Sequence, residues 1–248
     1  MKSPLRRLAD NTNADSLATN LPRRRFGAFL QMADNLAKSA GRPLNILDVG
    51  GTESFWVAMG ATSLPHHVTL LNLDEVPTRY PNITSFAGDA RDMAEFRDRQ
   101  FDIVLSNSVI EHVGTFADQA KMAKEVQRVA DHCFVQTPSF FFPLEPHFLF
   151  PFFQWFPVRL RVWLLMNFSL GWFERQSSRE EALRIVSGIR LMKASELKAL
   201  FPGARINRER VLGLTKSYIV SKWDGGGFQG VRNAYPVIAE YSLLHLGQ

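Results

Sequence analysis

Short apolar runs alternate with more polar stretches along the first half of the chain, and each run has the length of one buried strand. The stretches between the runs are compatible with helices. Strands that alternate with helices are typical of a parallel sheet with helices packed on it. The pattern predicts five such strands, at residues 44–49, 68–73, 83–86, 101–106 and 133–136.

Helical spacing predicts a first helix that begins at Pro22, because proline is tolerated in the first turn of a helix. Gly41 and Pro43 end it, and we expect it to cover one edge of the sheet. Its apolar side chains are Phe26, Phe29, Leu30, Ala33, Leu36 and Ala37.

The second half of the chain predicts further helices and a final pair of strands at the sheet edge. The helices are expected at residues 121–129, after Ser178 and after Ser195, and the strands at residues 205–212 and 216–223. Residues 225–227, all glycine, then open a flexible tail.

Residues 139–177, called the aromatic segment below, interrupt this alternation with a high density of Phe and Trp. Pro151 and Pro157 break its apolar run, and Arg159, Arg161 and Asn167 lie in the remainder. What is left is shorter than the roughly 20 residues that a membrane-spanning helix needs. Two interpretations stay open, namely a cap that closes over the substrate or an apolar surface that rests on lipid or on a partner subunit.

The positive charge of the chain is concentrated at its N-terminal end. The formal net charge is +5, and residues 1–43 hold eight Lys or Arg against three Asp, which accounts for the whole excess. The neutral remainder argues against a groove for nucleic acid. We interpret the run Arg23-Arg24-Arg25 as the solvated start of a helix, with phosphate contact as the alternative.

Cys133 is the single cysteine, so an internal disulfide is excluded and a reducing compartment is indicated. The N-terminal residues are polar and contain no apolar stretch followed by a cleavage site. We therefore expect a cytoplasmic enzyme, with peripheral membrane contact through the aromatic segment left open.

Two segments contain the residues that indicate a function. Residues 46–51 read Ile-Leu-Asp-Val-Gly-Gly, a buried strand that runs into a glycine turn, and residues 102–113 read Asp-Ile-Val-Leu-Ser-Asn-Ser-Val-Ile-Glu-His-Val. Together with the acidic strand ends at Asp74 and Asp89, they resemble a class I S-adenosylmethionine-dependent methyltransferase of the type 11 kind, whose fourth strand ends in a Glu-His-Val-like step. Thr52 and Ser54 depart from the family's glycine-rich loop.

The resemblance implies a Rossmann-like α/β fold. It has a seven-stranded, mostly parallel sheet with one antiparallel strand, helices on both faces and an aromatic helical insert after strand 5. The expected divisions are an N-terminal arm and helix (1–43), a cofactor-binding core (44–138), the aromatic segment (139–177), the end of the core with a terminal hairpin (178–223) and a tail (224–248).

The implied cofactor is S-adenosyl-L-methionine, with S-adenosyl-L-homocysteine as product. Gly50 and Gly51 allow the backbone to approach the methionine part, and Asp48 orients this loop or receives the ammonium group. The ribose hydroxyls are expected to bind Asp74, with Asn72 as the reserve candidate. The remaining ligands are Asp89 and Ala90 for adenine and Asn107 for the methionyl group.

Two histidines are candidate bases that would remove a proton from the acceptor hydroxyl. His112 is expected at the start of a helix near the pocket mouth, and His147 lies in the aromatic segment. His66 and His67 have no carboxylate or cysteine at ligand spacing and are interpreted as surface residues, so no metal is expected.

The expected function is methyl transfer to an oxygen, less readily a nitrogen, of a small, glycosidic or lipid-linked acceptor. A nicotinamide-dependent oxidoreductase is disfavoured because Gly50-Gly51-Thr52-Glu53-Ser54 lacks the required Gly-x-Gly-x-x-Gly. An inactive methyltransferase-like binding module and an RNA methyltransferase remain as alternatives, and a homodimer is left open.

Overall fold

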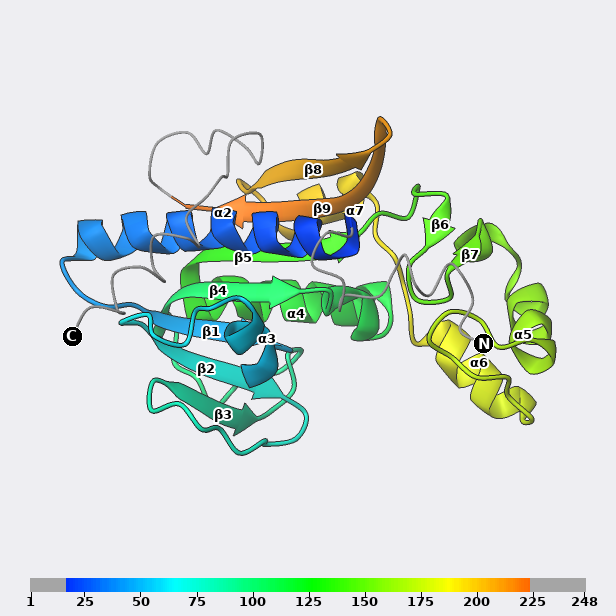
Figure 1. The fold of residues 1–248 in the computed structure, drawn as a ribbon, viewed down its shortest axis with the longest axis horizontal. Helices are drawn as coiled ribbons and strands as arrows, with labels where there is room; N and C mark the ends of the chain where they lie inside the picture. Colours follow the sequence, from blue (N-terminus) through cyan, green and yellow to red (C-terminus); the bar gives the residue numbers. More distant parts are fainter. Residues whose placement is uncertain (1–16, 224–248) are drawn as a thin grey trace.

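The computed structural model describes residues 17–223 and is built around one seven-stranded sheet (Figure 1). The strand order is β3-β2-β1-β4-β5-β9-β8. Strands β1 to β5 run parallel, whereas β9 is antiparallel to both of its neighbours. The strands are β1 (Asn45–Val49), β2 (His67–Asn72), β3 (Ile83–Ala87), β4 (Phe101–Asn107), β5 (Ala130–Pro138), β8 (Arg205–Val211) and β9 (Leu214–Lys222).

Helices cover both faces of this sheet, and the predicted Rossmann-like topology with one antiparallel strand is confirmed. Successive strand residues point to opposite faces. In β1, Ile46 accordingly packs with α2 (Leu17–Ala40), whereas Leu47 belongs to the core shared with α4 (Phe116–Val129) and α7 (Ala194–Leu200).

The first helix departs from its prediction in two ways. It begins at Leu17, so Pro22 lies inside it, because residues 17–21 contain no helix-breaking residue. It also covers the middle of one face rather than an edge, since the aromatic rings of Phe26 and Phe29 pack into a core that includes Ile103 of the central strand β4. The residues before 17 and the glycine run at 225–227 lie outside the described residues.

The helix expected to begin at Glu111 and His112 begins later. Ile110–His112 forms a short 3-10 turn, η1, and α4 begins only at Phe116. Thr115 sets this start, because its hydroxyl accepts from the amide of Asp118 at 3.3 Å and the Asp118 carboxylate accepts from the amide of Thr115 at 3.0 Å. Glu111 and His112 therefore lie on a short turn directly after β4.

The chain between β5 and β8 forms a small core of its own beyond the carboxyl ends of the parallel strands (Figure 1). This region contains β6 (Leu144–Glu145), β7 (Phe150–Pro151), η2 (Phe153–Trp155), α5 (Val158–Asn167) and α6 (Arg179–Ser187). Phe148, Phe153 and Leu165 pack there against Ala182 and Val186 of α6. Among the described residues, no helix is long and apolar enough to cross a membrane.

Candidate cofactor-binding site

The carboxyl ends of the strands converge on a cavity of about 230 Å³, called the strand-end pocket. It lies where the strand order reverses between β1 and β4, the position at which open α/β sheets bind ligands. Its walls come from the segments that follow β1, β2, β3 and β4. They are Val49, Gly50, Leu71, Asn72, Leu73, Gly88, Asp89, Ala90, Arg91, Val109, His112 and Val113.

The turn after β1 requires both of its glycines. Gly50 has a φ of +73°, a conformation that side chains other than glycine rarely adopt. A Cβ on Gly51 would lie 1.9 Å from Oδ2 of Asp48, which no real contact allows. Thr52, where the family's glycine pattern is broken, is the N-cap of α3 (Glu53–Ala58), because its hydroxyl accepts from the amide of Phe55 at 3.2 Å.

Asp48 lies beneath this turn and does not line the strand-end pocket. Its Oδ2 accepts from the indole Nε1 of the buried Trp56 at 2.8 Å. Burial raises the pKa of this carboxyl to about 7, against the opposing effect of the Trp56 hydrogen bond. Of the two expected roles, the geometry therefore favours orientation of the turn.

The predicted ribose ligand and its reserve differ in position. Asn72 ends β2, lines the strand-end pocket and donates from Nδ2 to the carbonyl of Gly51 at 2.8 Å. Asp74 lies two residues further along the chain, is exposed and does not line the pocket. The Asn72 side chain thus ties the turn after β1 to the end of β2.

Asp89 and Ala90, the predicted adenine ligands, both line the strand-end pocket. The guanidinium of Arg91 bonds the Asp89 carboxylate, with 2.6 Å between Nη2 and Oδ2 and 2.9 Å between Nε and Oδ1. These bonds hold the pKa of Asp89 below its usual value. The carboxylate is therefore an anion at neutral pH, and its two oxygens retain lone pairs for another donor.

Asn107 ends β4 but does not line the pocket, because its side chain turns toward α2. Its Oδ1 accepts from Nη1 of Arg25. The interpretation of Arg25 as a solvated residue was wrong, since it is buried and pairs with the buried Glu209 of β8 at 2.8 Å between Nη2 and Oε2. Sequence reasoning missed this pair because its members lie at opposite ends of the chain.

His112 and His147 lie together although they come from distant segments. Their rings meet edge to face with centroids 4.7 Å apart. The exposed His112 lines the strand-end pocket, and partial loss of hydration at its ring, together with the nearby His147, lowers its pKa to about 4. Burial acts downward on the pKa of His147 as well, but the hydrogen bond with Glu145, 2.7 Å from Nδ1 to Oε1, outweighs it and the pKa is raised.

Glu111 also belongs to this group, and the sequence analysis gave it no role. It is fully buried, and its Oε2 accepts from the hydroxyl of Thr137 at 2.9 Å. Burial raises its pKa to about 6, against the opposing effects of its own backbone amide and of His147. The Glu-His-Val step was the available signal, but only its histidine was considered.

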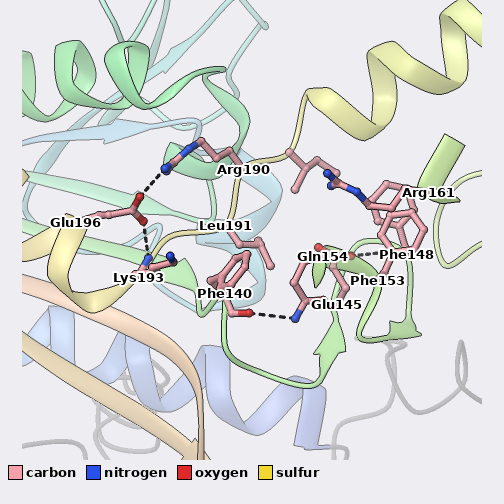
Figure 2. Close-up of a pocket in the computed structure, with 11 residues that line it drawn as sticks. Phe140, Glu145, Phe148, Phe153, Gln154, Arg161, Arg190, Leu191, Lys193 and Glu196 are labelled. Carbon is pink, nitrogen blue, oxygen red and sulfur yellow. Dashed lines mark hydrogen bonds and ion pairs between the residues drawn. The ribbon is translucent and has the colours of Figure 1, made fainter. Parts of the chain in front are cut away.

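A second cavity, of about 250 Å³, lies where the aromatic segment meets the chain before α7 (Figure 2). We call it the aromatic pocket. Figure 2 shows Arg190, Lys193 and Glu196 on one side and Arg161 with Phe148 on the other. The remaining walls are Phe140, Glu145, Phe153, Gln154, Ile189 and Leu191. Apolar rings and positive groups therefore face the same space.

His66 was wrongly expected at the surface. It is buried, and its Nδ1 accepts from the amide of Leu44 at 3.3 Å, because the segment that leads into β2 passes beside the start of β1. Its neighbour His67 is exposed.

Comparison with known proteins gives one family match. Residues 47–132 match the family model described as a methyltransferase domain. These residues contain the end of β1, all of β2, β3 and β4, the glycine turn and the Glu111-His112 step. Residues 47–132 form a class I S-adenosylmethionine-dependent methyltransferase domain. This domain is thus an S-adenosyl-L-methionine-dependent methyltransferase domain.

Solved structures with similar folds include other methyltransferases. The chain resembles the 1,6-didemethyltoxoflavin-N1-methyltransferase of Burkholderia thailandensis, whose structure contains S-adenosylhomocysteine, at 15% identity over 79% of this chain and 77% of that chain, with a TM-score of 0.45. A protein of Pyrococcus horikoshii gives 15% identity over 86% and 94%, with a TM-score of 0.48. A methyltransferase of Methanosarcina mazei gives 14% over 73% and 92%, with a TM-score of 0.44. No curated protein matches.

Proposed function

We propose that this methyltransferase transfers the methyl group to a hydroxyl oxygen of a small, glycosidic or lipid-linked acceptor. The proposal rests on the side chains that connect the two pockets. His112 lines the strand-end pocket, Glu145 lines the aromatic pocket, and His147 contacts both His112 and Glu145. The donor in the first pocket and the acceptor in the second would then meet at the two histidines.

The strand-end pocket offers groups for each part of the cofactor. We propose that Gly50 and Gly51, supported by Asp48, receive the methionine part, with Asn107 behind it at the end of β4. The ribose would lie over Asn72, within reach of the exposed Asp74. Adenine would lie against Asp89 and Ala90. The close backbone approach at the glycine turn, where a Cβ has no room, supports this placement.

The aromatic pocket supports the acceptor class. Phe140 and Phe148 offer apolar faces, and Lys193 lies 5.2 Å from the Phe140 ring centroid. Burial lowers the pKa of Arg161, which Glu145 opposes. These features suit an acceptor with an apolar body and a negative group. Oxygen is favoured because the residues at the end of β4, Asn107-Ser108-Val109, lack the Asn-Pro-Pro-aromatic step of many base-amine methylating enzymes.

The cofactor supplies a methyl group already activated by a positive sulfur. The protein therefore has to align the acceptor oxygen with that carbon and exclude water. Transfer to a hydroxyl oxygen would also require a base that takes up the hydroxyl proton. We propose that His112 and His147 act on this hydroxyl, with Glu145 fixing the ring of His147 as an orienting carboxylate does in other proton-transfer sites.

We also propose a division of the chain close to the expected one, with an arm and helix (1–43), a cofactor-binding core (44–138), the aromatic segment, the end of the core and a tail. The packing of α6 against Phe148 and Phe153 supports counting α6 with the aromatic segment. The cap that closes over the acceptor would then include α5 and α6.

Calorimetry with S-adenosylhomocysteine tests the proposed placement of the cofactor. We expect one molecule to bind per chain and Asp74→Ala to weaken binding about tenfold, because a carboxylate that bonds a ribose diol contributes on the order of 1.5 kcal/mol or more. Asp131→Ala is the matched control, since Asp131 is exposed at the amino end of β5. Absence of heat with the unmodified protein rejects the strand-end pocket as the cofactor site, and equal affinities of the two variants reject the Asp74 assignment.

The exposed side chains of the aromatic segment support a second role for it, contact with a membrane surface. Phe141, Trp155, Trp163, Phe168 and Trp172 are all exposed large apolar side chains. α5 carries two arginines and no acidic residue. We propose that this surface also contacts anionic lipid, which would present a lipid-linked acceptor to the aromatic pocket. A second copy of the chain is the competing occupant.

Sedimentation with vesicles that contain phosphatidylglycerol tests the lipid contact. The protein is expected to co-sediment, and Trp163→Ser with Phe168→Ser is expected to reduce the bound fraction severalfold, because two exposed aromatic side chains are removed. Leu212→Ser is the control, since Leu212 is also apolar and exposed but lies in the β8–β9 turn, outside the aromatic segment. Equal sedimentation of all three proteins, or a concentration-dependent dimer without vesicle binding, contradicts the lipid contact.

A further inference from the structure

Glu111, His112 and His147 form a compact cluster of metal-ligating side chains. Each offers one ligand atom, and these atoms all lie within 4.8 Å of one another. Glu111 and His112 come from η1 after β4, and His147 comes from the loop between β6 and β7. The cluster therefore joins the methyltransferase core to the aromatic segment.

The carboxylate of Glu111 has an unused oxygen that is fully buried. Its Oε2 accepts from Thr137, whereas Oε1 has no hydrogen-bond partner. A buried acceptor without a partner costs about 1 to 3 kcal/mol, and more when it is charged. Such an atom is retained where a ligand satisfies it, and a cation is the ligand that a carboxylate oxygen beside two imidazoles suits best.

His147 is held as metal-binding histidines are held. Its Nδ1 is engaged by Glu145 at 2.7 Å, which leaves Nε2 available. The same Glu145 carboxylate accepts from the amides of His147 and Phe148, at 2.7 and 2.6 Å, and the amide of Trp172 donates to the His147 carbonyl at 3.1 Å. A carboxylate behind a histidine fixes its tautomer and ring orientation and is the usual support of a ligating imidazole.

We propose that Glu111, His112 and His147 bind a divalent transition-metal ion. Two imidazoles and one carboxylate are the donor set of open catalytic zinc and iron sites, which keep positions free for a substrate. Metal–ligand bonds of about 2.1 Å place the donor atoms roughly 3 to 3.5 Å apart. Side-chain rotations that move each donor atom by about 1 Å therefore complete the site.

A catalytic role of the ion, unlike its binding, rests on the proposed function. His112 lines the strand-end pocket and Glu145 lines the aromatic pocket, so an ion at the cluster would lie between the proposed donor and acceptor sites. An ion there stabilises negative charge on the acceptor oxygen and favours loss of its proton. The sequence expectation of no metal considered only His66 and His67, because nothing local indicates that His147 lies beside His112.

Titration of metal-free, untagged protein with Co²⁺ tests the site directly. We expect one ion per chain in the micromolar range, with the visible absorption bands of nitrogen-coordinated cobalt, and competition by Zn²⁺ measured by calorimetry. His112→Ala and His147→Ala are expected to abolish the bands. Glu145→Gln is expected to weaken binding by about tenfold to 100-fold, because it removes only the support of His147.

His67→Ala is the matched control, since His67 is exposed and lies outside the cluster. It should bind Co²⁺ as the unmodified protein does, and far-ultraviolet circular dichroism establishes that each variant is folded. If a ligand variant does not fold, Glu145→Gln and the cobalt spectrum of the unmodified protein still decide the matter. No binding at millimolar Co²⁺, or equal binding by the folded ligand variants, overturns the proposal.

The metal site and the proposed placement of the cofactor can be rejected independently. Binding of S-adenosylhomocysteine without binding of Co²⁺ rejects the metal site and leaves the histidines to act on the hydroxyl directly. Binding of Co²⁺ at the three side chains without S-adenosylhomocysteine binding supports the metal site and rejects the proposed cofactor placement.

Discussion

Gly51→Ala is expected to weaken the binding of S-adenosylhomocysteine at least tenfold and to lower the free energy of unfolding. The added Cβ would lie 1.9 Å from Oδ2 of Asp48, so either the turn or the carboxylate must move. The carboxylate is not free to move, because the Nε1 of the buried Trp56 donates to it. Overpacking of this kind costs about 1 to 3 kcal/mol. Calorimetry and urea unfolding measure the two effects.

Gly27→Ala provides the matched control. Gly27 lies inside α2, and a Cβ added there meets nothing within 4 Å. Alanine is favoured over glycine in a helix by about 1 kcal/mol, so this variant should be as stable as the unmodified protein or slightly more stable. Unchanged affinity of Gly51→Ala would mean that the turn after β1 does not hold the cofactor.

The fold could be predicted from the sequence because its signals are local. The apolar run before Gly50 and the run that begins at Phe101 each have the length and composition of a buried strand, and both became neighbouring strands. The parallel order then places the ends of these strands at one pocket. Asp89 and Ala90, which the family resemblance assigned to the cofactor site, both line this pocket, and their contact with adenine stays a prediction.

The missed features depend on contacts between distant segments. No pattern near His147 indicates that the aromatic segment folds back until this ring meets that of His112. Arg25 lies in a run of three arginines, which usually marks a solvated surface, and its partner follows 184 positions later. The late start of α4 differs from these cases, because Thr115 and Asp118 have the local spacing of a capping box, and this signal was overlooked.

Glu209→Ala is expected to destabilise the protein by about 3 to 5 kcal/mol, because removal of one partner leaves a buried charge uncompensated. Arg25 bonds both oxygens of Glu209, at 3.2 Å from Nε and 2.8 Å from Nη2, and the hydroxyl of Ser217 donates to the same carboxylate. Arg25→Met should cost a comparable amount, and urea unfolding of the two single variants and the double variant gives their coupling energy.

The exposed pair Arg184 and Glu181 on α6 is the matched control, since such pairs contribute about 0 to 1 kcal/mol. Glu181→Ala should therefore leave stability nearly unchanged. Arg25 also holds Asn107 at the end of β4. If Asn107 contributes to the cofactor site, the Arg25→Met variant will bind S-adenosylhomocysteine more weakly than the Glu209→Ala variant does. Both affinities are measured under conditions in which the variants are folded. Equal stability of Glu209→Ala and Glu181→Ala would contradict the proposed contribution of the buried pair to stability.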